Sequence, residues 1–203
     1  DINLEGRFSS RRERVTISLE NSSLFWAEKA ISIENINSSL SLYPGQYTLN
    51  SLSFVADSQD FTIEGRYFPK AKEELSLQIS SKSFRPANWF VHELLSDSDY
   101  LSGVIRVRGK ADNFAASGEL SGFWEKSGEF SSNFKLQFSD DSLAIDELFF
   151  STKDGSAHFD GWLKRDLHYA LSAEIYNINL SSFLAVELNN LSGKFSASGL
   201  STD

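Results

Sequence analysis

The chain has 203 residues, no cysteine and a formal net charge of −9. An acidic chain lacks the basic face that displaces counterions from nucleic acid, so nucleic acid is excluded as a partner. The missing cysteines exclude disulfides and thiolate metal sites. With 17 Phe, 4 Trp and 6 Tyr, the chain is too aromatic to be disordered.

Apolar residues two positions apart recur from the start of the chain, which predicts one strand after another with a single apolar face. The first runs start at Ile2, Val15, Leu24, Ile31 and Leu40. The pair Pro44-Gly45 predicts a turn. Serine and charged residues fill the intervening positions, so the other face is expected to meet water.

Two longer stretches carry the same pattern. The first stretch extends from Tyr47 to Tyr67 and reads YTLNSLSFVADSQDFTIEGRY. Its apolar and glycine positions match those of the second stretch, from Leu143 to Leu163, without a gap. In the second stretch Asp154-Gly155 lies between two alternating runs, which is a strong hairpin signal. A register held over this length predicts an internal repeat.

A three-residue step interrupts the alternation at Ile33-x-x-Ile36, Leu49-x-x-Leu52 and Ile145-x-x-Leu148. Such a step turns the apolar face over unless one extra residue is absorbed, so it predicts a β-bulge or a tight turn that adds curvature. The carboxylates Asp146 and Glu147 occupy one of these steps. As neighbours on a strand they are expected to point to opposite faces and not to share a substrate.

The strand pattern stops twice, and short helices are predicted near 86–95, from i,i+4 apolar pairs, and near 182–188, where Ser181 or Ser182 could cap. Pro86 suits a first helical position. Each predicted helix is followed by the same Leu-Ser-Gly motif, Leu101-Ser102-Gly103 and Leu191-Ser192-Gly193. These matches predict repeat units at 1–100 and 101–190 and the start of a third at 191–203. Since the chain begins at Asp1 and ends partway through a unit, residues 1–203 are expected to be a fragment of one repeat β-groove domain.

The order of short helix, Leu-Ser-Gly, bulged strand, turn and Phe-x-Gly-x-Leu resembles the AsmA-like superfamily, and within it the TamB family of translocation and assembly module proteins. The resemblance implies a mainly β fold, an elongated antiparallel repeat sheet folded into a hydrophobic groove (a β-taco). It also implies a periplasmic protein of a Gram-negative bacterium, anchored in the inner membrane by a segment outside this stretch. The implied partners are phospholipid acyl chains and, through the full-length chain, an outer-membrane β-barrel protein. The implied function is phospholipid transport to the outer membrane, with a linked role in outer-membrane protein assembly.

The residues themselves also lead to a groove. An antiparallel sheet with one apolar face must cover that face, and two short helices are too few to do so. Folding the sheet on itself leaves a dry sandwich core or an open channel. Apolar side chains left in water cost ~1.5–3 kcal/mol each, and an acyl chain would relieve that cost without needing hydrogen bonds. The candidate groove residues are Leu49, Leu52, Phe54, Phe61, Ile63, Leu75, Leu77, Ile79, Ile105, Val107, Leu136, Phe138, Leu143, Ile145, Leu148, Phe150, Phe159, Leu163, Leu171 and Ile175.

No catalytic constellation is found. His92, His158 and His168 lack metal-site spacing, no phosphate loop or nucleophile elbow is present, and no enzyme activity or cofactor is expected. Phe149 and Trp162 fall on the polar side of the alternation, where they pack against neighbouring units, contact a partner or are exposed. Two other functions remain open: an assembly scaffold that pairs through strand edges, and a closed sandwich that binds carbohydrate or protein through its loops.

Overall fold

The computed structural model describes residues 2–3, 6–11, 14–26, 31–69, 74–88, 96–110, 112–125, 128–178 and 191–200. These residues are mainly strand, as predicted, and they group into two compact units. Unit 1 comprises Asp1–Phe84 and Val104–Ala111, and unit 2 comprises Arg85–Gly103 and Asp112–Asp203.

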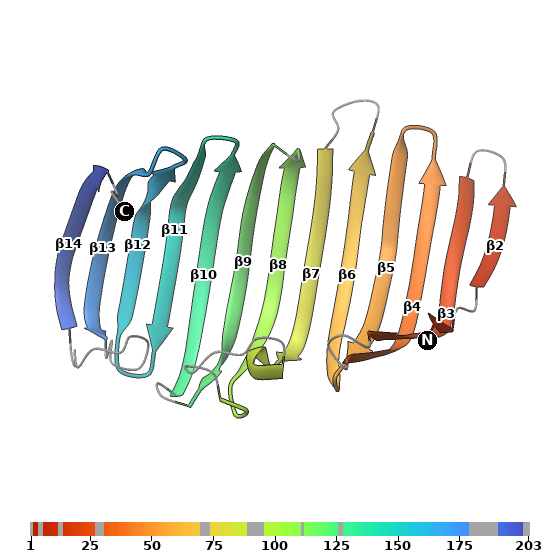
Figure 1. Cartoon of the computed structure of the whole chain (residues 1–203), viewed down its shortest axis with the longest axis horizontal. Coiled ribbons are helices and arrows are strands. Elements are labelled where there is room, and N and C mark those ends of the chain that lie inside the picture. Colours follow the sequence, from red (N-terminus) through yellow and green to blue (C-terminus); the bar gives the residue numbers. More distant parts are fainter. Residues whose placement is uncertain are drawn as a thin grey trace. The chain divides into compact units, whose positions relative to one another are not determined.

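Unit 1 is an open antiparallel sheet whose strands pair in chain order from β3 onward (Figure 1). Its strands are β1 (Ile2–Asn3), β2 (Gly6–Arg11), β3 (Arg14–Trp26), β4 (Ile31–Tyr43), β5 (Gln46–Ala56), β6 (Gln59–Phe68), β7 (Glu74–Phe84) and the end of β8 (Tyr100–Lys110) from Val104 onward. Both β1 and β2 pair with β3. The predicted turn at Pro44-Gly45 joins β4 to β5, and Gly45 there has a φ of 80°.

Unit 2 is also open and antiparallel. It contains the start of β8, then β9 (Asn113–Trp124), β10 (Gly128–Ser139), β11 (Ser142–Thr152), β12 (Ser156–Lys164), β13 (His168–Ile178) and β14 (Leu191–Leu200). The predicted hairpin at Asp154-Gly155 joins β11 to β12, where the Thr152 N–H donates to the Gly155 carbonyl at 2.8 Å.

The one helix in the described residues is the 3₁₀ turn η1 (Pro86–Asn88). It begins at Pro86, the residue predicted for the first helical position. Residues 89–95 of the first predicted helix lie outside the described residues. The second predicted helix, at 182–188, lies outside them entirely.

Cross-strand register assigns every side chain in the sheets to one of two faces, because directly paired residues point to the same side. In unit 2 one row across the sheet reads Gly118, Phe134, Leu148, Phe159, Ala173 and Phe195. The row beside it on the other face reads Glu119, Asn133, Phe149, His158, Glu174 and Lys194. We call these sides the apolar face and the polar face. The predicted alternation is confirmed, as is the placement of Phe149 and Trp162 on the polar face.

The three-residue steps are β-bulges and not tight turns. The strand register changes between Leu49 and Leu52 and again between Ile145 and Leu148. These two steps are at equivalent positions of the two repeat copies. The third step also falls at a register shift, and Asn35 within it has a φ of 53°. Absorbing the extra residue returns the next apolar side chain to the apolar face.

The bulge in β11 corrects the expectation for its two carboxylates. Asp146 accepts a hydrogen bond from Gln137 at 2.7 Å, and Glu147 pairs with Lys135. Gln137 and Lys135 are two residues apart on β10 and lie on the polar face, so both carboxylates point to that face. The prediction of opposite faces was wrong because a bulge places two consecutive residues on the same side.

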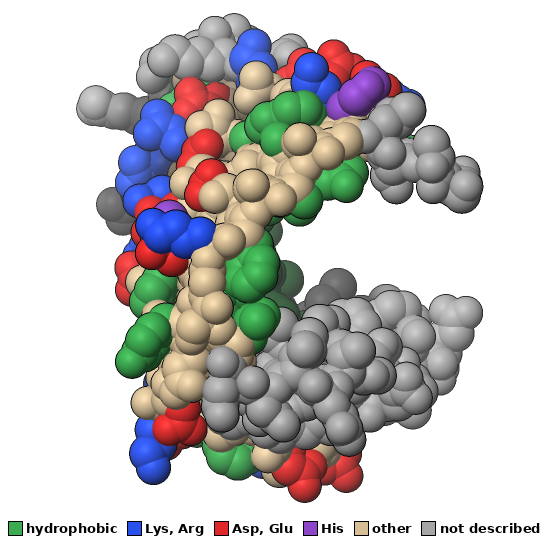
Figure 2. Space-filling view, turned by 90° about the vertical axis from the view of Figure 1, so that its left-hand side faces the viewer, with side chains coloured by type: hydrophobic (Ala, Val, Ile, Leu, Met, Phe, Trp, Pro, Cys, Tyr) green, Lys and Arg blue, Asp and Glu red, His purple; other side chains and the backbone are tan. Residues whose placement is uncertain are grey.

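The strands of unit 2 are bent along their length. Figure 2 looks at the β14 edge of this unit and shows hydrophobic side chains inside the bend, with most Lys, Arg, Asp and Glu side chains outside it. Bulges increase local twist and bend a strand, which accounts for curvature in a sheet that carries them at matched positions.

Candidate functional site

The candidate residues of β5, β6 and β7 come together on the apolar face of unit 1. Leu52 pairs with Ile63 and Ile63 with Ile79, while Phe54 pairs with Phe61. Leu49 and Leu77 both pair with Gly65, and Leu75 pairs with Tyr67 in the next row. All eight candidates on these three strands therefore share one surface.

Ile105 and Val107 of β8 extend this surface. Arg106 lies between these two residues and donates to the Gln78 side chain at 3.2 Å. Arg108 follows Val107 and forms an ion pair with Glu74 at 2.7 Å. Gln78 alternates with Leu77 and Ile79 and so lies on the polar face. Because side chains alternate along a strand, Ile105 and Val107 point to the apolar face.

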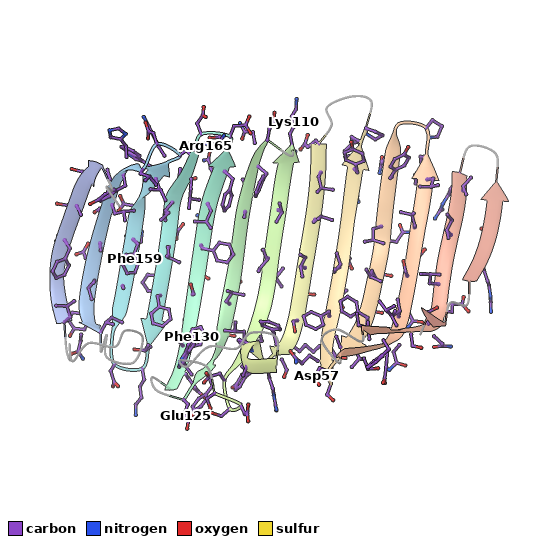
Figure 3. The ribbon with its side chains drawn as sticks, viewed as in Figure 1. Asp57, Lys110, Glu125, Phe130, Phe159 and Arg165 are labelled. Atoms are coloured by element: carbon purple, nitrogen blue, oxygen red, sulfur yellow. The ribbon has the colours of Figure 1, made fainter. Side chains whose placement is uncertain are left out.

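The ten candidates of unit 2 also lie on one face, in four adjacent rows. Phe138, Leu143 and Leu163 share the first row, and Leu136, Ile145 and Leu171 share the second. Leu148 pairs with Phe159 in the third row. In the fourth row Phe150 pairs with Ala157, which pairs in turn with Ile175. Figure 3 shows Phe159 partway along its strand, with Glu125 and Arg165 at opposite strand ends.

The large side chains of this face are only partly covered. Among the described residues, the buried hydrophobic residues are Ala56, Ala116, Ala157, Ile175 and Ile178, so no Phe or Leu side chain is fully buried. On the apolar face of unit 2, Leu163 and Leu171 are each 42% exposed and Phe195 is 45% exposed. A dry sandwich core would instead enclose its aromatic side chains at crystal-like density.

Part of the apolar face in unit 2 is packed more tightly. Ala157, Ile175 and Ile178 form a small buried cluster, and Phe150 and Phe159 pack against it. Aromatic stacking adds order: the ring centroids of Phe130 and Phe150 are 5.4 Å apart. Near the opposite strand ends, those of Phe114 and Phe138 are 4.7 Å apart. The face is therefore a pre-formed surface and not a loose collection of side chains.

Sequence reasoning missed several members of this surface. Six aromatic residues of unit 2 lie on the apolar face without having been candidates: Phe114, Trp124, Phe130, Phe134, Tyr169 and Phe195. Phe134 could have been found, since it continues the period of Leu136 and Phe138. Phe130 is separated from that run by Ser132, and only the pairing of β10 with β11 places it beside Phe150.

The polar face carries the charges. Glu147 pairs with Lys135, and the hydrogen bond and the opposite charge lower the pKa of Glu147 and raise that of Lys135. At a turn, the hydrogen bond from His168 lowers the pKa of Asp166. No described group of three or more His, Asp or Glu side chains could hold a metal ion.

In the described strands β5 to β14, the rows of the apolar face carry no charged side chain and only a few polar groups, such as the hydroxyl of Tyr169, which suits a flexible apolar ligand. No helix within the described ranges is long and apolar enough to cross a membrane. Comparison with known proteins gave no matching family model, no matching curated protein and no matching solved structure.

Proposed function

We propose that the apolar face of this chain binds lipid acyl chains along a hydrophobic groove and forms a segment of a periplasmic conduit. In this proposal phospholipid moves between the inner and outer membranes of a Gram-negative bacterium, and the full-length chain has a linked role in outer-membrane protein assembly. The resemblance to the AsmA-like superfamily, and to TamB within it, supports the setting. The incomplete burial of large apolar side chains supports the binding.

The observation that carries the proposal is the contrast between the two faces. One side of each sheet is apolar along successive rows, yet Leu163, Leu171 and Phe195 remain close to half exposed. Leaving such side chains in water costs ~1.5–3 kcal/mol apiece when the exposure is complete. An acyl chain lying on this face would remove that cost and would itself need no hydrogen bonds from the wall.

The mechanism that follows is passive sliding. Because the wall is almost entirely apolar, a bound chain has no strongly preferred position and moves between equivalent rows. The polar headgroup stays toward water at the open side. Neighbouring rows have the same apolar character, so a step along the surface replaces each contact with a similar one.

Two measurements test the proposal together. We expect phospholipid in an organic extract of the gently purified chain, and we expect photo-crosslinkers at Phe138, Phe150 and Phe159 to capture lipid. A crosslinker at Phe149 is the matched control, because it is adjacent to Phe150 but lies on the polar face. Absence of phospholipid together with capture of protein alone at the three positions would overturn the proposal. Equal lipid capture at Phe149 would also contradict it.

A second function, assembly through strand edges, is favoured by one observation. Within the described residues β14 pairs on one side only, with β13. An unpaired edge can accept a strand from another β protein through main-chain hydrogen bonds. Crosslinks that form along β14 to a protein partner, and not on the apolar face, would support this function instead.

A further inference from the structure

We propose that unit 2 carries a saccharide-binding site on its polar face, centred on Trp162 of β12. The site lies on the opposite side of the sheet from the acyl-binding face. It does not depend on the lipid proposal, because the side chains that would contact the sugar lie on the polar face, opposite the candidate groove.

The directly paired cross-strand neighbours of Trp162 are small. It pairs with Ala144 on β11 and with Ala170 on β13, and Ala170 pairs in turn with Ser198 on β14. No large side chain from a directly paired position therefore covers the indole. The residue is 37% exposed, so part of the indole meets solvent.

A shallow hollow lies beside the ring. Its volume is about 340 Å³, and its lining residues are Asp160, Gly161, Trp162, Ala170, Leu171, Ser172, Ser196, Ala197 and Ser198. This volume falls at the lower end of the range for small-molecule sites. The small side chains of β13 and β14 form the floor, so the hollow follows directly from the alanines and serines in this part of the sheet.

The polar groups around the hollow suit a polyol. Asp160 pairs with Ser172, which pairs with Ser196, so one carboxylate and two hydroxyl-bearing residues share a row next to the tryptophan. A carboxylate accepts hydrogen bonds, and serine hydroxyls both donate and accept. Such a row can match the hydroxyl groups around a sugar ring.

The indole supplies the other half of the recognition. A sugar ring has an apolar face of C–H groups, which stacks on an aromatic face with dispersion and weak C–H contacts. The ammonium of Lys164 lies over the Trp162 ring, 5.2 Å from its centroid, and because Lys164 is exposed its side chain can move aside for a sugar ring. Asp160 and Lys164 flank Trp162 along β12, two residues away in either direction, and their opposite charges favour a neutral ligand over an anion. An acyl chain would leave these polar groups without partners.

The test is a titration of the ¹⁵N-labelled chain, following the indole N–H signal of Trp162 by NMR. The probes are chitotetraose and cellotetraose, each added up to about 10 mM, which covers weak millimolar affinity. We expect a saturable shift of this signal with at least one probe. We expect Trp162→Ala to weaken binding about tenfold, as measured by saturation-transfer NMR, because it removes the stacking surface.

Two further variants keep the test decisive. Ser198→Gln fills the hollow while leaving the tryptophan in place, and it should also weaken binding. Tyr176→Ala removes an aromatic side chain that is 69% exposed on the same face but outside the hollow, and it should bind as the unchanged chain does. If Trp162→Ala fails to fold, Ser198→Gln decides. No shift with either probe, or a shift that survives Ser198→Gln, would overturn the proposal.

Discussion

At the scale of single residues, Phe149 and Phe150 show how position on a strand decides role. They are adjacent and chemically identical, yet Phe149 pairs with His158 and Phe150 with Ala157, so they point to opposite faces. Phe150 stacks on Phe130 and packs against the small cluster of unit 2. Phe149 has polar neighbours. A substitution at each position therefore reports on one face alone.

Phe150→Asp is expected to lower the free energy of unfolding by about 1–2 kcal/mol and to leave the chain folded. The reason is that Phe150 is half-buried, so only part of the ~1.5–3 kcal/mol for full burial is lost. Urea unfolding followed by circular dichroism measures the change. Lipid co-purification should fall in the same variant.

The control is Phe149→Asp, which should cost less stability and leave lipid co-purification unchanged. A loss above about 4 kcal/mol for Phe150→Asp would indicate a closed dry core, where a lone buried charge is severely destabilising. That outcome would contradict an open apolar face.

The ion pair of Glu147 and Lys135 makes a prediction about pH. Since Lys135 lowers the pKa of Glu147 in the folded chain, the pair stabilises the fold above the unfolded-state pKa of about 4.3, and this stabilisation is lost as the pH falls below it. NMR titration of the Glu147 carboxyl should give a midpoint below the ordinary glutamate value. Lys135→Met should raise that midpoint, and an unchanged midpoint would mean that the pair does not form in solution.

At the scale of elements, a glycine recurs opposite a leucine of the next strand. A Cβ added at Gly65 or Gly161 would meet the side chain of Leu77 or Leu171, and one added at Gly103 would meet that of Leu120. The leucine lies over the glycine, so the two strands interlock on the apolar face. Gly65 and Gly161 also occupy the same position in the two repeat copies, each paired with the last residue before a bulge.

Gly161→Ala is expected to destabilise unit 2 by roughly 1–3 kcal/mol. Gly161 has a φ of 147°, where side chains are strained, and its Cβ would collide with the Ala170 carbonyl oxygen. Thermal unfolding measures the loss. Gly199→Ala is the matched control, because its Cβ would meet only the Tyr169 ring at ordinary distances of 3.5 Å or more. Equal effects of the two substitutions would show that backbone strain is not the cause.

At the scale of the whole molecule, each unit is a single layer with two chemically different faces. Such a layer buries little of its apolar surface by itself, and the described residues contain few fully buried hydrophobic side chains. An uncovered apolar face of this kind is typical of a ligand or partner site. Acyl chains on one face and a sugar on the other would use the two faces independently.

The sequence by itself determined the strands, the repeat, the turns at Pro44-Gly45 and Asp154-Gly155, and most of the apolar face. These features depend on local periodicity and turn chemistry, which a single chain segment encodes. The tertiary structure decided which residues lie side by side across strands. Pairing placed Phe130 beside Phe150, and the bulge in β11 put Asp146 and Glu147 on one face. It also left Trp162 between two alanines. Register between distant strands depends on the sum of contacts along both, and no pattern within one strand contains that information.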